Sequence, residues 1–448
     1  MKTIITGAKI VNEERLIDNA TVVIQDELIT HVLENETWNP DPDDIVIDAS
    51  GMYMFPGVID CHVHFREPGY TYKADIESES RTAAAGGVTS YMEMPNTNPP
   101  TTTPELLEEK YDIASKNSRV NYSFFFGATN DNINLLRHLD PHRVPGVKVF
   151  MGSSTGNLLV DDSNAMRRIF ETSPLRIVAH CEDNNIIEQN IKAFKRKYKG
   201  QNDFPVRYHS RIRSVEACYE ATSRAVELAR QTGARLHVAH VSTERELELF
   251  DSKPLAEKQI TAEACIAHLM FTTEDYDQLG TKIKCNPAVK TPEDQAALRD
   301  ALTDGRIDIV ATDHAPHLLD EKVGGALRAM SGMPLVQFSL VSMLELVDKG
   351  VLPLQHVPTL MSHNPATLYN IDRRGYIRQG YYADLVIVDP DANWQVAEGR
   401  YYTKCGWTPM DERTFKWRVV RTLVNGVTAY CNGIVVDGIR GAELKFNV

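Results

Sequence analysis

The sequence predicts an α/β fold: a (β/α)8 TIM-type barrel with a small β-domain formed from the N- and C-terminal segments. Two observations predict this fold. Between residues 56 and 365, apolar strand-like runs alternate with amphipathic helical stretches, a pattern typical of a closed parallel barrel rather than an open sheet. At the two chain ends, residues 1–55 and 366–448, strand-like patterns dominate instead.

The N-terminal segment begins with β-branched alternation that turn residues interrupt, in KTIITGAKIVN and NATVVIQDELITHVL. The barrel strands are predicted by the runs that follow: FPGVIDCHVHF, GGVTSYMEMP, RVNYSFFFGA, VPGVKVF, LRIVAHCED, ARLHVAHVS, KQITAEACIAH and IDIVATDHAPH. The candidate helices between these strands are residues 74–85, 105–116, 163–171, 211–231 and 293–304.

Strand texture returns after residue 366, in ADLVIVDP, KWRVVRTLVNGVTAY and GIVVDG. Neither chain end is long enough to build a sizeable core by itself. We therefore expect residues 1–55 and 366–448 to pair into one small β-domain, and residues 56–365 to form the barrel.

Composition narrows the class of protein. The 448 residues include 48 Lys and Arg against 61 Asp and Glu, a formal charge of −13, which argues against nucleic acid as a partner. The sequence contains no run of 18 apolar residues, so we expect no membrane span. Its first residues turn polar too early for a signal peptide. Seven cysteines without a CxxC pair suggest reduced thiols, so we expect a cytoplasmic protein.

Four predicted strands end in side chains that can bind a metal ion. An HxH pair, His62 and His64, follows GVID, and residues i and i+2 of a strand point to the same side. The runs LRIVAH, ARLHVAH and IDIVATD end in His180, His240 and Asp313. Because the C-terminal ends of barrel strands share one rim, where barrel enzymes keep their active sites, we expect these side chains to converge on a metal site.

Two further residues leave alternatives open. Alternation places His240 on one face of its strand and His237 on the other, so we assign the ligand role to His240 and expect His237 to pack behind the barrel. Lys148 in VPGVKVFMG is either an ordinary buried or snorkelling lysine, or a lysine that has added carbon dioxide to give a carbamate bridging two metal ions.

A family resemblance accompanies these patterns. Seven segments resemble the amidohydrolase superfamily and, within it, the dihydroorotases. They are DCHVHFREPG, AAAGGVTSYMEMPNTNPP, GVKVF, IVAHCED, HVAHVST, CNPAVKTPEDQAAL and DIVATDHAPH. The resemblance implies two zinc ions per chain, bridged by carboxylated Lys148. It implies as their ligands His62, His64, Lys148, His180, His240 and Asp313. Some members use an aspartate as the bridge, for which Asp161 and Asp162 are the fallback candidates.

The resemblance also implies an activity: reversible hydrolysis of dihydroorotate, a small molecule, to N-carbamoyl-L-aspartate in pyrimidine biosynthesis. Arg66 and Asn96 stand where allantoinases typically differ, and a guanidinium suits the substrate carboxylate. His317 is expected to help hold that carboxylate, and Asn286 to contact the ring. Asp313 is expected to transfer the proton. The base rate for oligomers favours a homodimer.

Alternatives remain open at this point. The chain resembles other cyclic amidohydrolases, namely allantoinases and dihydropyrimidinases or hydantoinases, and a non-catalytic scaffold related to dihydroorotases is a third reading. Residues 318–332 depart from the Gly-Leu-Glu-Thr pattern of close relatives, so this loop is either a mobile lid or a plain surface loop. His268 is interpreted as structural, with a position behind the metal ligands as the alternative.

Overall fold

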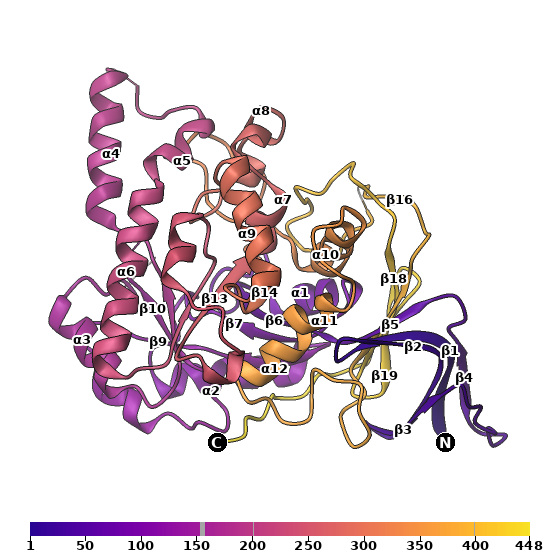
Figure 1. The fold of residues 1–448 in the computed structure, drawn as a ribbon. Coiled ribbons are helices and arrows are strands. Elements are labelled where there is room, and N and C mark those ends of the chain that lie inside the picture. Colours follow the sequence, from indigo (N-terminus) through magenta and orange to yellow (C-terminus); the bar gives the residue numbers. More distant parts are fainter. Residues whose placement is uncertain (153–156, 200, 398) are drawn as a thin grey trace.

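The computed structural model describes residues 1–152, 157–199, 201–397 and 399–448, which form a parallel barrel with a mixed sheet beside it (Figure 1). In Figure 1 the sheet lies to the right of the barrel, and both chain termini lie at the lower edge. No helix of the described residues is both long enough and apolar enough to cross a membrane.

The barrel strands pair in parallel, in the orders β6-β7-β8 and β9-β10-β11-β12-β13-β14. Their bounds are β6 Val58–Val63, β7 Val88–Glu93, β8 Asn121–Phe124, β9 Phe126–Gly127, β10 Val147–Phe150, β11 Ile177–His180, β12 Leu236–Val238, β13 Ile260–Cys265 and β14 Ile309–Ala311. Only Phe125 separates β8 from β9, and a parallel bridge between Val63 and His314 brings the end of β14 beside β6. The predicted α/β barrel fold is confirmed.

The predicted helices are present, and polar caps explain where they begin. They are α1 Ile76–Ala85, α2 Pro104–Asn117, α3 Ser163–Thr172, α6 Val215–Thr232 and α9 Pro292–Asp304, with α4 Asn184–Lys197 and α10 Ser339–Asp348 in addition. Each of the five predicted helices begins after a polar side chain that accepts a hydrogen bond from a backbone N–H group of the first turn. These capping residues are Asp75, Thr103, Asp162, Ser214 and Thr291. Shorter helices are α5 His209–Ile212, α7 Ile266–Met270, α8 Tyr276–Leu279, α11 His356–Pro358 and α12 Asn364–Leu368.

Two connections of the barrel differ from the expected strand-plus-helix unit. Strand β9 is followed by the 3-10 helix η1 (Ile133–His138), and β12 is followed by the 3-10 helix η3 (Arg245–Leu249). The 3-10 form has a tighter turn than the α-helix and is common in short connecting segments.

The second sheet combines strands from both chain ends in the order β20-β19-β18-β15-β5-β1-β2-β3, with β4 paired to β1. The bounds are β1 Lys2–Asn12, β2 Arg15–Gln25, β3 Leu28–Glu34, β4 Ile45–Asp48, β5 Tyr53–Pro56, β15 Leu385–Asp389, β18 Arg418–Val424, β19 Val427–Cys431 and β20 Ile434–Val435; β16 Trp394–Gln395 pairs with β17 Thr414–Phe415. The small β-domain is thus built from both termini, and its boundaries at residues 55 and 366 stay a prediction.

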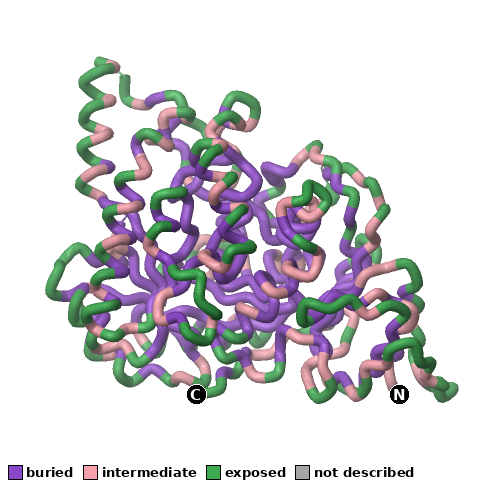
Figure 2. The backbone as a smooth tube through the Cα atoms, in the orientation of Figure 1, coloured by how far each residue is buried: buried purple, intermediate pink, exposed green. Residues whose placement is uncertain are grey.

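The last residues of the chain return to the barrel. Leu444 donates its backbone N–H to Tyr122 at the start of β8, and Phe446 donates to His142. Leu444 and Phe446 are buried with Ile59 and other residues of the barrel interior. Figure 2 shows the buried backbone concentrated in the barrel strands and in the neighbouring sheet, while the outer helices carry the exposed residues.

Candidate active site

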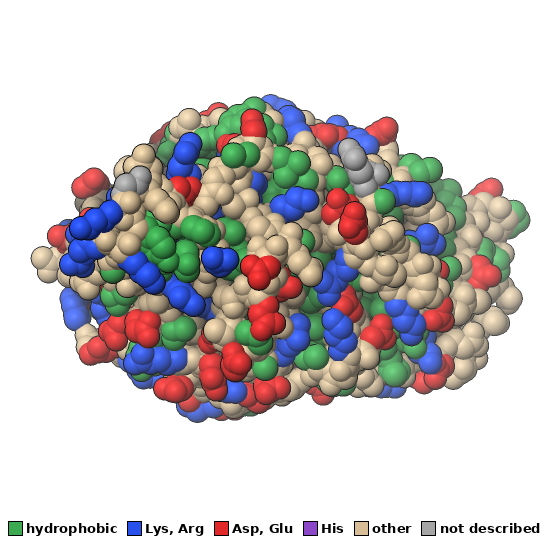
Figure 3. All heavy atoms as spheres, turned by 90° about the horizontal axis from the view of Figure 1, so that it is seen from above, with side chains coloured by type: hydrophobic (Ala, Val, Ile, Leu, Met, Phe, Trp, Pro, Cys, Tyr) green, Lys and Arg blue, Asp and Glu red, His purple; other side chains and the backbone are tan. Residues whose placement is uncertain are grey.

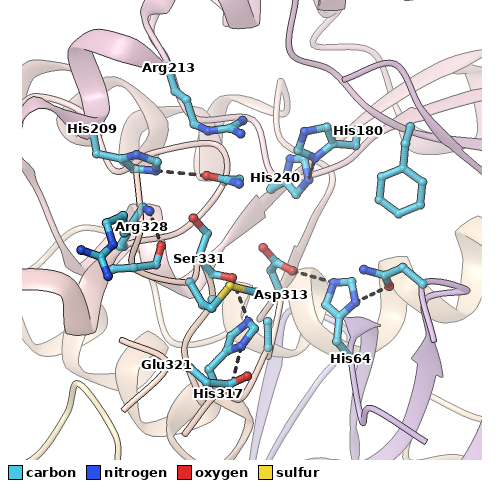
Figure 4. A pocket seen from close by; sticks show the side chains of 18 of the residues that line it. His64, His180, His209, Arg213, His240, Asp313, His317, Glu321, Arg328 and Ser331 are labelled. Atoms are coloured by element: carbon cyan, nitrogen blue, oxygen red, sulfur yellow. Dashed lines mark hydrogen bonds and ion pairs between the residues drawn. The ribbon is translucent and has the colours of Figure 1, made fainter. Parts of the chain in front are cut away.

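A cavity of about 500 Å³ opens at the C-terminal ends of the barrel strands. Every site residue predicted from the sequence lines it: His62, His64, Arg66, Asn96, Lys148, His180, His240, Asn286, Asp313 and His317. The convergence expected from the strand ends therefore exists in the folded chain, and Figure 4 shows part of this set.

The first group of metal-capable side chains comes from β6 and the turn after β14. His64 Nε2 lies 3.0 Å from Asp313 Oδ1, and His62 Nε2 lies 3.5 Å from the same oxygen. One ligand atom from each of these residues lies within 4.8 Å of the others. Two imidazoles and one carboxylate at this spacing could hold a divalent cation.

The second group comes from β11 and the turn after β12. His180 Nδ1 lies 2.9 Å from His240 Nε2, and Figure 4 shows the two rings close together near Asp313. The ring centroid of His240 is also 5.3 Å from that of His62, which joins the two groups. Two imidazole nitrogens facing each other at this distance could share a second cation.

Lys148 lies on β10 and lines the same cavity. Its side chain is fully buried, and among the described residues its Nζ atom has no hydrogen-bond partner. Burial lowers the pKa of this amine, although the carboxylates of Glu263 and Asp313 oppose the shift. An unpaired amine in this position is chemically suited to form a carbamate, because the neutral amine is the nucleophile that adds carbon dioxide.

Burial also sets the protonation state of the imidazoles. It lowers the pKa of His64 to about 4, and it lowers the pKa values of His180 and His240. These rings are therefore neutral at pH 7, which is the form that binds metals. Burial alone would raise the pKa of Asp313, but the nearby His62 and His64 rings lower it to about 2, so its carboxylate is ionised.

Three residues of the site have left-handed backbone conformations. Arg66 has φ 70°, His240 has φ 39° and Asp313 has φ 50°. Such conformations are costly for residues other than glycine, and they cluster at functional sites. Each of the three follows a strand end, so the turn redirects the side chain from the strand alternation into the cavity.

The structure corrects the expectation for His237. Its side chain does not pack behind the barrel, because its Nδ1 contacts Thr261 Oγ1 at 2.9 Å and its Nε2 lies 3.4 Å from Glu263 Oε2, on the same carboxylate that contacts His62. Alternation failed because β12 ends at Val238, two residues before His240. The preference for His240 as the cavity residue agrees with the structure, although the argument for it was wrong.

Sequence reasoning missed the side chains that orient the imidazoles. His62 Nδ1 donates to Glu263 Oε1 at 2.7 Å, and the backbone N–H of His240 donates to the same oxygen at 3.1 Å. His180 Nε2 donates to Glu182 Oε2 at 3.0 Å. Each carboxylate fixes the tautomer that leaves the other ring nitrogen free for a metal.

Asn96 has a contact that the sequence did not indicate. Its Oδ1 accepts a hydrogen bond from His64 Nδ1 at 2.7 Å, so the amide oxygen orients an imidazole. Its amide group still lines the cavity. The expected role of Asn96 in substrate binding therefore rests on its Nδ2 atom.

Replacing Glu263 by Gln should lower metal affinity by about 10- to 100-fold, because a neutral partner weakens the hold on His62. Metal release to a competing chelator measures the effect. Glu246→Gln is the matched control, since Glu246 is an equally buried carboxylate that contacts Thr222 and Thr243 instead of a histidine. Equal affinity in Glu263→Gln and wild type would contradict this assignment.

The cavity lining is rich in basic side chains. Arg66 Nε donates to the Pro316 carbonyl at 3.1 Å, and Arg66 Nη2 lies 3.1 Å from His317 Nε2. Besides Lys148, the basic residues lining the cavity are Arg66, Lys73, Arg213, Lys284 and Arg328. Among the described lining residues the acids are Asp313 and Glu321, although the whole chain carries a charge of −13. The cavity is therefore suited to an anionic ligand.

Asn286 is held by a histidine that the sequence analysis did not single out. His209 Nε2 lies 3.0 Å from Asn286 Oδ1 and 2.9 Å from the Cys285 carbonyl. Burial lowers the pKa of His209 to about 3, so the ring is neutral and donates through Nε2. The amide nitrogen of Asn286 is thereby left for a ligand.

Residues 318–332 form a wall of the cavity rather than a plain surface loop, since residues 326–332 line it. Lys322 Nζ donates to the Met330 and Gly332 carbonyls at 2.8 and 2.7 Å. The Asp203 carboxylate accepts the backbone N–H of Gly325 at 2.6 Å. A Cβ atom at Gly325 would stand 1.8 Å from the Phe204 carbonyl oxygen, so the close approach requires glycine.

The remaining candidates do not line the cavity. Asp162 caps α3 by accepting from the Ala165 N–H at 2.7 Å, and Asp161 accepts from Asn130 at 3.1 Å. Neither lines the cavity. His268 lies 3.0 Å from the Pro287 carbonyl and is buried beside Cys285, which agrees with a structural role.

Comparison with known proteins agrees with this geometry. The sequence matches the amidohydrolase family over residues 53–429. It is 34% identical to a dihydroorotase of Halobacterium salinarum, over 90% of this chain and 92% of that protein. It is 30% identical to an allantoinase of Bacillus velezensis, over 96% and 94% of the two chains. The structure resembles that of an L-hydantoinase (dihydropyrimidinase) from Arthrobacter aurescens with a TM-score of 0.91, 27% identity and 97% coverage of both chains.

The fold and the cavity together define a barrel hydrolase with metal-capable side chains at the C-terminal ends of its strands. The chain belongs to the amidohydrolase family, and it is a hydrolase that acts on cyclic amides. Relatives with three different names cover nearly its whole length, so the choice among cyclic amides has to be argued from the site.

Proposed function

We propose that the chain is a dihydroorotase, which interconverts dihydroorotate and N-carbamoyl-L-aspartate by reversible hydrolysis of the ring amide. The observation that carries the proposal is Arg66. It is a buried guanidinium at the cavity wall, whose Nε donates to the Pro316 carbonyl and whose Nη2 lies 3.1 Å from His317 Nε2. Dihydroorotate carries a carboxylate beside its ring, which allantoin and simple hydantoins lack, and a guanidinium pairs with a carboxylate through two parallel hydrogen bonds.

We further propose that the site binds two zinc ions. His62, His64 and Asp313 would hold one, His180 and His240 the other, and carboxylated Lys148 would bridge them. The orphaned Lys148 amine and the neutral imidazoles fit this set. When bound, the metal ions supply Lewis-acid polarisation of the amide carbonyl and activation of water.

The chain's own residues then have defined tasks. Asp313, ionised at neutral pH, accepts a proton from the attacking water and delivers it to the leaving ring nitrogen. Glu263 and Glu182 keep His62 and His180 in one tautomer. Arg66, with Asn96 and His317, binds the substrate carboxylate and thereby orients the carbonyl toward Asp313. Asn286 donates to the ring through its amide nitrogen.

Replacing Arg66 by Ala should raise KM for dihydroorotate by about 10- to 100-fold, because a charge-assisted contact with the carboxylate is lost. A smaller fall in kcat is expected from poorer positioning. Steady-state kinetics measure both constants. Wild-type values of both would contradict the carboxylate clamp.

The function itself is tested with purified, metal-reconstituted protein offered dihydroorotate, allantoin and hydantoin side by side. We expect the highest kcat/KM for dihydroorotate. A preference for either neutral ring would assign the chain to the allantoinase or hydantoinase activity named for its relatives. A protein without metal and without turnover would support the scaffold.

A further inference from the structure

A buried lysine stands behind the proposed carboxylate site. Lys73 precedes α1, is 4% exposed and lines the cavity. Its Nζ atom lies 3.0 Å from His317 Nδ1 and 3.0 Å from Glu321 Oε1. Glu321 also accepts the Tyr72 hydroxyl at 2.9 Å and the Leu318 backbone N–H at 2.8 Å. Lys73 is thus fixed between one acceptor carboxylate and one imidazole.

The contact with Lys73 decides which nitrogen of His317 carries the proton. Lys73 and Arg66 can both only donate, and they face Nδ1 and Nε2 of the ring at 3.0 and 3.1 Å. The tautomer with the proton on Nε2 makes two hydrogen bonds, because Nδ1 accepts from Lys73 while Nε2 donates to a backbone carbonyl. The geometry therefore favours a proton on Nε2. This tautomer also satisfies the Ser331 carbonyl, 3.1 Å from Nε2. The opposite tautomer would face the Lys73 ammonium with an N–H and would reach Glu321 only at 3.5 Å, beyond a good hydrogen bond.

Burial, reinforced by the charges of Arg66 and Lys73, lowers the pKa of His317 well below its usual value. The ring is therefore neutral, and its tautomer matters.

The consequence is a pair of converging donors. With the proton on Nε2, both His317 Nε2 and Arg66 Nη2 are donors, and they lie 3.1 Å apart. Two donors this close gain nothing from each other unless an acceptor oxygen lies between them. A carboxylate oxygen of a ligand would accept from Arg66 Nη2 and would share the Nε2–H of His317 with the Ser331 carbonyl, 3.1 Å away. A neutral ring without a carboxylate would not bring a negatively charged acceptor to these two donors.

We propose that Lys73 is a positioning residue that holds His317 as an Nε2–H donor, so that His317 and Arg66 together bind one oxygen of the substrate carboxylate. This inference rests on the proposed function for the identity of that carboxylate. Lys73 contributes to selectivity without contacting a metal-capable side chain, because it acts through His317. The two residues are 244 positions apart in the chain.

The kinetic test compares Lys73→Met, which keeps most of the apolar stem but removes the charge and the donor, with Lys73→Arg, which keeps both. We expect KM for dihydroorotate to rise about 10- to 100-fold in Lys73→Met, with a smaller change in kcat and unchanged metal content. Lys73→Arg should recover most of the loss. An unchanged KM would overturn the proposal, and so would a loss of metal and kcat together, which would indicate a merely structural role.

A spectroscopic test is independent of activity. In wild-type protein labelled with ¹⁵N-histidine and assigned with His317→Gln, the His317 signals should show a protonated Nε2 and an unprotonated Nδ1. In Lys73→Met the signals should shift toward a mixture of tautomers. A wild-type proton on Nδ1 would overturn the inference even if dihydroorotate is hydrolysed. A protein that shows the Nε2–H form but fails to hydrolyse dihydroorotate would instead contradict the proposed function.

Discussion

Replacing Asp313 by Asn should lower kcat by about a thousandfold or more. Asp313 Oδ1 lies within 3.0 Å of His64 and 3.5 Å of His62, so the same carboxylate is placed to hold a metal and to carry the proton. The amide keeps the shape of the side chain but loses both the negative charge and the basic oxygen. General acid–base catalysis alone contributes about 10²–10⁴-fold, and weakened metal binding adds to the loss. Steady-state turnover of metal-reconstituted protein measures the effect.

Metal content has to be measured on the same sample, because it separates the two tasks of Asp313. An Asp313→Asn protein that keeps its metals but not its turnover would support the proton-transfer role. Substantial turnover by such a metal-replete variant would contradict it.

Replacing Lys148 by Met should remove at least one metal ion per chain and lower turnover by about a hundredfold or more. Methionine fills a similar volume in this fully buried position, but it cannot form a carbamate. The fallback bridge candidates provide the matched controls. Asp161→Asn and Asp162→Asn should keep metal and activity, since Asn also caps a helix and neither residue lines the cavity.

The carbamate itself can be separated from a plain amine. Metal-free wild-type protein should regain activity poorly when zinc is added in buffer depleted of carbon dioxide, and added bicarbonate should restore it. Full reconstitution without bicarbonate, or retained metal in Lys148→Met, would show that Lys148 is not the bridge.

The charge pattern on the surface fits the expectation of a small-molecule substrate. On the face shown in Figure 3, acidic and basic side chains are interspersed with hydrophobic and polar ones. Basic side chains that line the cavity, among them Arg66 and Lys73, are buried instead. A compact anion can reach such groups more readily than an extended polyanion.

Much of the fold could be predicted because local signals agree with one another. Apolar runs buried on both faces, such as β6 and β7, alternate with helices that begin at Asp, Ser or Thr caps. The interruption at Phe125 and the 3-10 helices η1 and η3 were missed, since these depend on how tightly the chain must turn between neighbouring strands. The periodicity of apolar residues in the sequence does not show how tightly the chain turns between two strands.

The cavity residues could be predicted as far as strand ends reveal them. The HxH pair, the polar end of β11 and the turn after β14 place side chains at one rim. The orienting side chains could not be found in this way. Glu263 meets His62 across 201 residues of sequence, and Lys73 meets His317 across 244, so only the folded chain shows these contacts.

The most direct test of the account is anomalous X-ray scattering from crystals of the zinc-reconstituted protein. The account predicts two zinc peaks at the cavity floor, one beside His62, His64 and Asp313 and the other beside His180 and His240, with carbamate density on Lys148 between them. A single peak elsewhere, or no peak at these side chains, would contradict the claim that they converge to hold a pair of metal ions.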